Sequence, residues 1–207
     1  MDKFSLKNVA TNEFDYNILM SLLKSYSQPW SKIKALLRSE EIIRVKKGLY
    51  VKNPKDWGPF SEGVLANLIY GPSYISREFA LSIHGLIPER VSLVTSVSMK
   101  PSKTFKTEVG HFDYKHLSHE RYAFGFMAVS IDNERNYLLA TPEKSLVDTI
   151  FDKDISSTTE LLEYLEYSLR IEKDSIRKMN AKVLQELARR FRRPIIHALA
   201  LLNKELK

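Results

Sequence analysis

The sequence has no cysteine among its 207 residues, which excludes disulfides, thiol nucleophiles and cysteine-ligated metal sites. It also lacks a phosphate-binding loop, a G-x-S-x-G nucleophile elbow and any low-complexity tract. No apolar run approaches the roughly 20 residues that span a bilayer, and the first residues lack the apolar segment of a signal peptide. We therefore expect a cytoplasmic protein that is not an enzyme, binds no cofactor or metal, and has no membrane partner.

Charge is distributed unevenly along the chain, whose formal net charge is +7. Residues 1–60 carry 11 Lys and Arg against 6 Asp and Glu, and residues 170–207 carry 11 against 4. Residues 61–169, by contrast, carry 10 against 15. Two basic ends around an acidic middle favour phosphate backbones or an acidic partner at the ends.

The stretch 30–51 predicts a short helix followed by a hairpin. Its first apolar residues recur at helical spacing: Trp30, Ile33, Leu36 and Leu37. The β-branched run 42–45 and the segment 49–51 read as two strands, and Gly48 permits a tight turn between them. Helix, strand, basic turn and strand form the second half of a winged helix-turn-helix.

Hydroxyl and basic side chains lie on the other face of this helix and along the hairpin, where they suit base edges and phosphates. The expected DNA contacts are Ser31, Lys32, Lys34 and Arg38 of the helix, and Arg44, Lys46, Lys47 and Lys52 of the wing. The alternative is a generic helix-and-hairpin packing unit with a solvated basic face. Only one helix, residues 14–24, is evident before residue 30, so either residues 2–9 supply a third helix or the unit is trimmed.

Two prolines and a glycine in residues 53–60 mark a domain boundary. We predict an α+β protein, with a winged-helix domain at 1–56 and a mixed α/β domain at 57–207. Ser61 and Ser76 should cap helices that open the second domain. Five strands should form a small antiparallel sheet: 91–96, 104–109, 111–116, 123–129 and 136–140. A helical C-terminal tail follows, with caps at Thr141, at Ser157 or Thr158, and at Asn180, and a last helix after Pro194.

Five stretches between roughly residues 15 and 150 carry distinctive motifs: GLY at 48–50, YGPSYIS at 70–76, HGLIPERV at 84–91, residues 105–114, and ATPEKSLVD at 140–148. Together they resemble the AbiEi-like antitoxins of type IV toxin–antitoxin systems, an abortive-infection family of transcriptional regulators. The stretches with LIPERV and ATPEK are the most distinctive.

The resemblance implies a winged-helix domain joined to an antitoxin domain. It implies autorepression through inverted repeats in double-stranded operator DNA, and neutralisation of a nucleotidyltransferase-fold toxin with or without a stable complex. Such a repressor could act as a monomer or a homodimer. The alternative function is a protein- or RNA-interaction module that does not read DNA and uses the basic C-terminal helices.

Two other candidate sites, a metal site and a nuclease site, have structural alternatives. His111, His116 and His119 lie close in sequence, but strand geometry points the first two to opposite faces, which favours structural histidines over a metal site. Glu143 and Asp148 could suggest nuclease chemistry, but they are five residues apart. We expect instead a first-turn acid and a half-buried, hydrogen-bonded aspartate.

Three charged or polar segments remain, and two of them have two interpretations each. Residues 73–77 form either a recognition loop or a turn that sets the angle between two helices. Glu89 and Arg90 are expected to pair locally. The cluster Arg189, Arg190, Arg192 and Arg193 either contacts phosphate or an acidic partner, or is a solvated helix end. In the first interpretation Arg189, Arg192 and Arg193 share a helix face.

Overall fold

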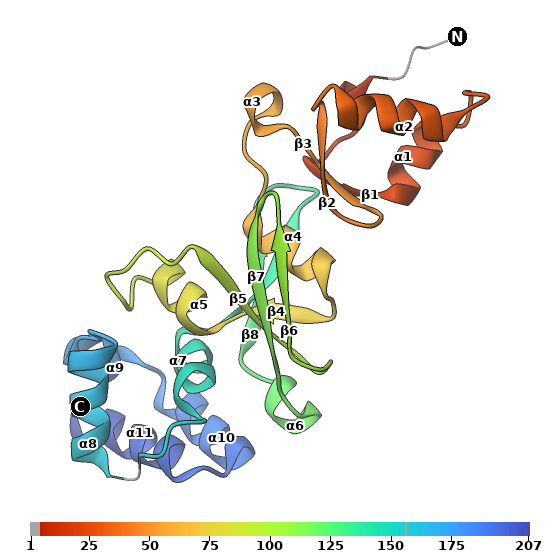
Figure 1. Ribbon diagram of the computed structural model, residues 1–207. Helices are drawn as coiled ribbons and strands as arrows, with labels where there is room; N and C mark the ends of the chain where they lie inside the picture. Colours follow the sequence, from red (N-terminus) through yellow and green to blue (C-terminus); the bar gives the residue numbers. More distant parts are fainter. Residues whose placement is uncertain (1–4, 156) are drawn as a thin grey trace.

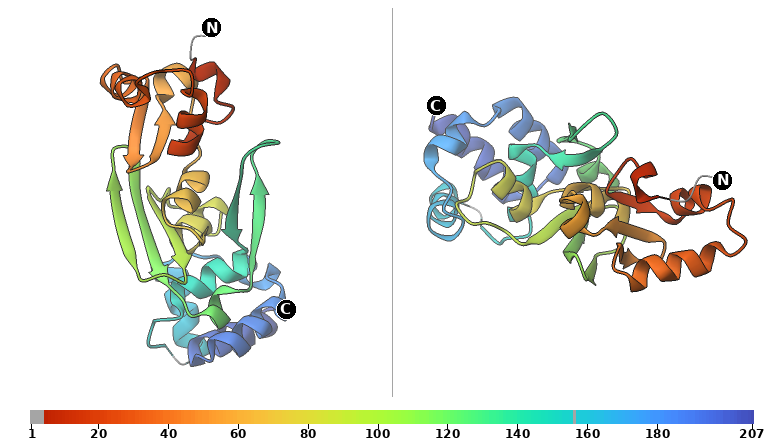
Figure 2. Two further views of the ribbon diagram at one scale, coloured as in Figure 1. Left: turned by 90° about the vertical axis from the view of Figure 1, so that its right-hand side faces the viewer. Right: turned by 90° about the horizontal axis from the view of Figure 1, so that it is seen from above.

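A computed structural model describes residues 5–155 and 157–207 (Figure 1). The fold is α+β, with a three-stranded antiparallel sheet and a six-stranded mixed sheet. The small sheet belongs to an N-terminal lobe at one end of the molecule, and the last helices lie at the other end (Figures 1 and 2). No helix in the described ranges has both the length and the apolar character needed to cross a membrane. We call residues 5–57 the lobe and the described residues after them the body.

The lobe is built from short elements: the 3₁₀ turn η1 (Leu6–Asn8), β1 (Glu13–Asp15), α1 (Tyr16–Leu22), α2 (Pro29–Arg38), β2 (Ile42–Lys46), β3 (Leu49–Lys52) and α3 (Pro54–Trp57). Its sheet has the strand order β1-β3-β2. The predicted helix 14–24 begins later than expected because Phe14 belongs to β1, where it pairs with Tyr50. Asp15 caps α1 by accepting a hydrogen bond from the Ile18 amide. The apolar residues of a helix at 14–24 predict that Ile18 faces inward, but its side chain is exposed.

The body begins with a mixture of helices and strands: α4 (Glu62–Ile69), β4 (Ser73–Ile75), α5 (Arg77–Ile83), β5 (Leu93–Ser98), β6 (Lys103–Thr107), β7 (Gly110–His116), α6 (His119–Tyr122), β8 (Phe126–Ser130), β9 (Asn136–Ala140) and α7 (Pro142–Ile150). The strand order is β6-β7-β5-β4-β9-β8. The prediction of a small antiparallel sheet is wrong, because β5 pairs with β7, and β4 with β9, in parallel. The predicted five strands missed β4, which holds the two halves of the sheet together.

The tail continues with α8 (Thr158–Glu163), the π-helical turn η2 (Tyr164–Ser168), α9 (Lys173–Lys178), α10 (Ala181–Phe191) and α11 (Pro194–Glu205). These helices share an apolar core with α5 and α7. The predicted caps Ser61, Thr141, Ser157 and Asn180 are confirmed, since each side chain accepts a backbone amide hydrogen bond. Ser76 precedes α5 as expected, but its side chain makes no capping bond.

The hairpin β2–β3 packs on the body as well as on the lobe. Val45, Leu49 and Val51 belong to one buried cluster with Leu65 and Ile69 of α4. The opposite face of the small sheet belongs to the lobe's own core, which is formed with α1 and α2. The hairpin is therefore shared by both parts of the protein, and this sharing fixes its position.

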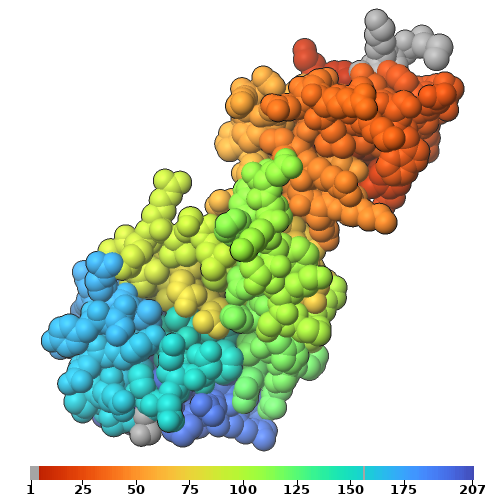
Figure 3. Space-filling view, viewed as in Figure 1, coloured from red at the N-terminus to blue at the C-terminus, as the bar shows by residue number. Residues whose placement is uncertain are grey.

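Polar contacts from Asn12 and from β1 add to this junction. The buried Glu13 carboxylate accepts a hydrogen bond from the Ser61 amide at the start of α4. The same carboxylate pairs with Arg135 of the β8–β9 turn at 3.5 Å. Asn12 donates to the backbone carbonyl of Pro59 at 3.0 Å. The space-filling view shows the lobe and the body meeting over a narrow region, beside the tip of the β6–β7 hairpin (Figure 3).

Candidate nucleic-acid interface

Helix α2 has one buried stripe and one basic outer face. Pro29 occupies its first turn, and Ile33 and Leu36 are buried in the lobe's core. The ten residues of α2 include no acidic side chain. Ser31, Lys34 and Arg38 are exposed, so three of the predicted DNA-contacting side chains lie on the solvent face. Lys32, also predicted, is half-buried on the same helix.

Trp30 does not continue the buried stripe as its spacing predicted. Its side chain is 57% exposed at the first turn of α2. The indole stacks on the ring of Tyr16, with the centroids 5.1 Å apart and an interplanar angle of 25°. The prediction failed because Tyr16 begins α1 beside this turn. The indole stacks on the Tyr16 ring and does not enter the core, which leaves much of its surface in solvent.

The hairpin beside α2 presents two exposed cations. Gly48 adopts φ +82° in the turn, a conformation that favours glycine, and Lys47 precedes it. Arg44 is exposed on β2, next to an irregularity in the register between Arg44 and Lys46. Arg44 and Lys47 therefore lie on the solvent side of the hairpin that was predicted to be a wing.

Two other lysines of the predicted wing have intramolecular partners. The Lys46 ammonium donates to the carbonyl of Ile69, at the end of α4. Lys52 is 4% exposed, and its ammonium donates to the Val9 carbonyl at 2.6 Å. Lys52 is therefore too buried to contact DNA as predicted. Lys46 links the hairpin to the body through its bond to the Ile69 carbonyl. Hydrophobicity could not reveal this, because a lysine that bonds a backbone carbonyl looks like any surface lysine in a sequence.

The environment of both lysines lowers their affinity for a proton. Burial lowers the pKa of Lys46, and the nearby cations Lys100 and Lys103 lower it further. Burial also lowers the pKa of Lys52, with a further lowering from Arg135 that Glu13 partly offsets. These shifts reflect packing at the junction between lobe and body, whereas Lys34 and Lys47 stay on the outer surface.

A groove of about 640 Å³ lies between α2 and the hairpin. Its lining consists of aromatic, aliphatic and basic side chains together with one glycine: Tyr16, Trp30, Ile33, Lys34, Leu37, Arg44, Lys47, Gly48 and Tyr50. None of these described lining residues is acidic. The groove, which the sequence did not predict, therefore combines an apolar surface with three cations.

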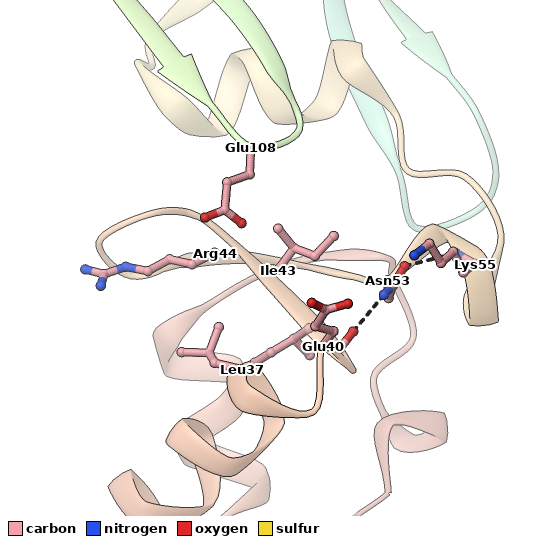
Figure 4. A pocket seen from close by; sticks show the side chains of 8 residues that line it. Leu37, Glu40, Ile43, Arg44, Asn53, Lys55 and Glu108 are labelled. Atoms are coloured by element: carbon pink, nitrogen blue, oxygen red, sulfur yellow. Dashed lines mark hydrogen bonds between the residues drawn. The ribbon is translucent and has the colours of Figure 1, made fainter.

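A second hollow, of about 490 Å³, lies on the other side of β2, between the lobe and the β6–β7 turn (Figure 4). Glu108 points from that turn toward Arg44 and Ile43 (Figure 4). Glu40 also lines this hollow. Its backbone carbonyl accepts a hydrogen bond from the side-chain amide of Asn53 at 2.8 Å. Two carboxylates make this side less suited to a phosphate than the groove beside α2.

The arginine cluster at the end of α10 is largely paired within the protein. Arg189 forms a bidentate salt bridge with Glu186, in which both N–O distances are 2.8 Å. Arg190 donates to the same carboxylate at 2.6 Å. These arginines lower the pKa of Glu186 to about 2. Arg192 pairs with Glu120 at 3.2 Å, and Arg193 donates to the Phe151 carbonyl at 3.1 Å.

The prediction that Arg189, Arg192 and Arg193 share a helix face is wrong. Helix α10 ends at Phe191, and Arg192 adopts a left-handed conformation with φ +51°. The chain turns at this point, and Arg193 precedes the next helix. Pro194 disfavours a helical conformation at Arg193, so the shared face could not extend to that residue, whereas the left-handed turn at Arg192 has no signal in the helical periodicity.

Two of the stretches that carry the family resemblance meet in the core of the body. Asp148 of α7 accepts hydrogen bonds from the Tyr74 hydroxyl at 3.1 Å and the Ser76 hydroxyl at 2.7 Å. The Lys144 ammonium lies 2.5 Å from the same carboxylate and also donates to the Arg121 carbonyl. Asp148 was expected to be half-buried and hydrogen-bonded; it is hydrogen-bonded and fully buried. These motif residues therefore hold β4 and α5 against α7.

The remaining candidates do not assemble into a reactive site. The Glu143 carboxylate accepts a hydrogen bond from the backbone N–H of Asn180 at 2.8 Å, away from the Asp148 network. Glu89 pairs with Arg170 of the tail, so the expected local pair with Arg90 is wrong. In the described part of the chain no three potential metal-ligating side chains lie close enough to hold an ion. Neither protein-family models nor curated proteins give a match to this chain.

Proposed function

We propose that this protein is a DNA-binding transcriptional autorepressor and the antitoxin of a type IV toxin–antitoxin system. The observation that carries the DNA-binding part is the outer face of α2, where Ser31, Lys34 and Arg38 are exposed beside Arg44 and Lys47 of the hairpin. A recognition helix in the major groove needs such a face, and a basic hairpin beside it suits the flanking phosphates.

The order of elements in the lobe supports a winged helix-turn-helix. Strand β1, helices α1 and α2, and the hairpin β2–β3 follow one another, and the three strands form one sheet. The 3₁₀ turn η1 stands where a winged helix usually has its first helix. We therefore propose a trimmed winged helix, with α2 as the recognition helix and the hairpin as the wing.

The antitoxin part rests on the resemblance of the stretches between roughly residues 15 and 150. The proposed partners are an operator with inverted repeats and a nucleotidyltransferase-fold toxin. The alternative, a protein- or RNA-binding module built on the basic tail, has less support because Arg189, Arg190 and Arg192 already pair with carboxylates. Paired arginines offer less uncompensated charge to an acidic partner.

Charge reversal on α2 separates the two roles. Lys34→Glu combined with Arg38→Glu should abolish repression of a reporter placed behind the protein's own upstream DNA, because both changes put carboxylates where phosphates would lie. The same variant should still rescue growth of cells that express the cognate toxin. A matched double variant, Lys24→Glu with Lys55→Glu, changes two exposed lysines outside α2 and should keep repression. Full repression by the α2 variant would refute the proposed reading face.

A further inference from the structure

The groove between α2 and the hairpin has more apolar surface than contact with a phosphate backbone requires. Trp30 and Tyr16 stack on one another at its edge, and Tyr50, Ile33 and Leu37 also line it. The stack restrains an indole whose surface is more than half exposed. A restrained, solvent-facing aromatic ring is the kind of surface on which a nucleobase stacks.

Three cations belong to the same groove, and they come from three different places. Lys34 projects from α2, Arg44 from β2 and Lys47 from the hairpin turn. No acidic residue is among the described groove residues, and within residues 5–155 and 157–207 none of the three cations forms an ion pair with a carboxylate. A ligand with one negative charge would need only one of them. The set is complementary to a polyanion such as a chain of phosphates.

We infer that this groove binds a nucleoside triphosphate, with the base against the aromatic side chains and the phosphates on Lys34, Arg44 and Lys47. The groove volume of about 640 Å³ lies within the range of small-ligand sites. A small aromatic acid would leave two of the cations uncompensated, and an inorganic polyphosphate would leave the apolar surface unused. A nucleotide uses both parts of the site.

Because the groove lies on the proposed DNA face, nucleotide binding should affect DNA binding. This consequence rests on the proposed function. Lys34, Arg44 and Lys47 also belong to the face that we propose for operator DNA. One set of cations cannot neutralise both polyanions at once, so nucleotide and DNA should compete. A rise in nucleoside triphosphate concentration would then release the operator.

The binding test uses calorimetric titration of the full-length protein with ATP and UTP. Two half-ligands serve as controls: tripolyphosphate, which has no base, and adenosine, which has no phosphate. We expect ATP to bind roughly tenfold or more tightly than either half-ligand, because stacking and charge contribute separately. Tripolyphosphate that binds as tightly as ATP would show only a basic surface and would overturn the inference, as would an absence of ATP binding at millimolar concentration.

Variants locate the site. Trp30→Ala and Arg44→Ala should each weaken ATP binding about tenfold, and Trp30→Phe, which keeps a ring, should weaken it less. Ile18→Ala and Lys55→Ala are the matched controls, an exposed apolar and an exposed basic residue of the same lobe outside the groove. Thermal unfolding of each variant checks that the lobe is intact. Equal losses from the groove variants and the controls would overturn the assignment to this groove.

A competition experiment separates this inference from the proposed function. Added ATP should displace the protein's own upstream DNA from the wild-type protein. It should not displace DNA from Trp30→Ala, which we expect to keep its DNA binding because Trp30 is not among the proposed DNA contacts. Retained DNA binding without any nucleotide binding would overturn this inference alone. ATP that binds the groove while the DNA complex persists would support the nucleotide site and contradict the placement of DNA on this face.

Discussion

At the scale of single residues, the Asp148 carboxylate collects three donors in the core of the body. Tyr74 lies in β4, Ser76 directly precedes α5 and Lys144 lies in α7, and both charged partners are fully buried. Burial lowers the pKa of Lys144, while the Asp148 charge opposes that shift. A buried pair of this kind adds little net stability compared with an apolar pair, but loss of one partner is costly.

Asp148→Ala should therefore destabilise the protein by about 3–5 kcal/mol, because it leaves the Lys144 ammonium buried without its counter-charge. The double change Lys144→Met with Asp148→Leu should recover most of that loss, since no charge then remains in the core. Urea unfolding at neutral pH measures both. A single variant as stable as the wild type would contradict the network's structural role.

Glu186 predicts a pH dependence at the surface of the tail. Its pKa is lowered to about 2 by Arg189 and Arg190. A carboxylate whose pKa is lower in the folded state contributes stability above its unfolded pKa, and that contribution is lost as the pH falls toward 2. The gap in melting temperature between wild type and Glu186→Gln should therefore be larger at pH 7 than at pH 3. An equal gap at both values would show that the ion pairs add nothing.

At the scale of elements, the strongest patterns in the sequence predicted the right structures. The helix α2, the hairpin turn at Gly48 and four N-caps could be predicted because local side chains determine them. Strands β1 and β4 could not, since each has only three residues and depends on distant partners. The same limit applies to the candidate site. The stack of Tyr16 on Trp30 and the bonds of Lys46 and Lys52 to backbone carbonyls depend on tertiary contacts.

The junction between β1 and α4 gives a prediction at this scale. Glu13→Gln removes the charge that pairs with Arg135 and weakens the acceptor of the Ser61 amide, so we expect a loss of about 1.5–3 kcal/mol in the free energy of unfolding. Glu134→Gln, an exposed residue of the β8–β9 turn, is the matched control and should cost little. Denaturant unfolding monitored by tryptophan fluorescence compares the two. Equal, small effects would mean that Glu13 does not stabilise the junction.

At the scale of the whole molecule, the lobe and the body share the hairpin β2–β3. Its outer residues Arg44 and Lys47 lie on the proposed DNA face, while Val45 and Val51 pack with α4. The body thus fixes the position of the hairpin relative to the rest of the protein. This arrangement supports the proposed repressor, because the body holds the hairpin beside the proposed DNA face in place.

We propose that the α2 face reads a DNA sequence. The most direct measurement is a gel-shift titration of the purified protein on its own upstream DNA, beside a shuffled duplex of the same composition, at two salt concentrations. We predict a preference for the native duplex that persists at the higher salt, because base contacts add to the salt-dependent phosphate contacts. Equal and steeply salt-sensitive binding to both duplexes would contradict the claim and leave only a basic surface.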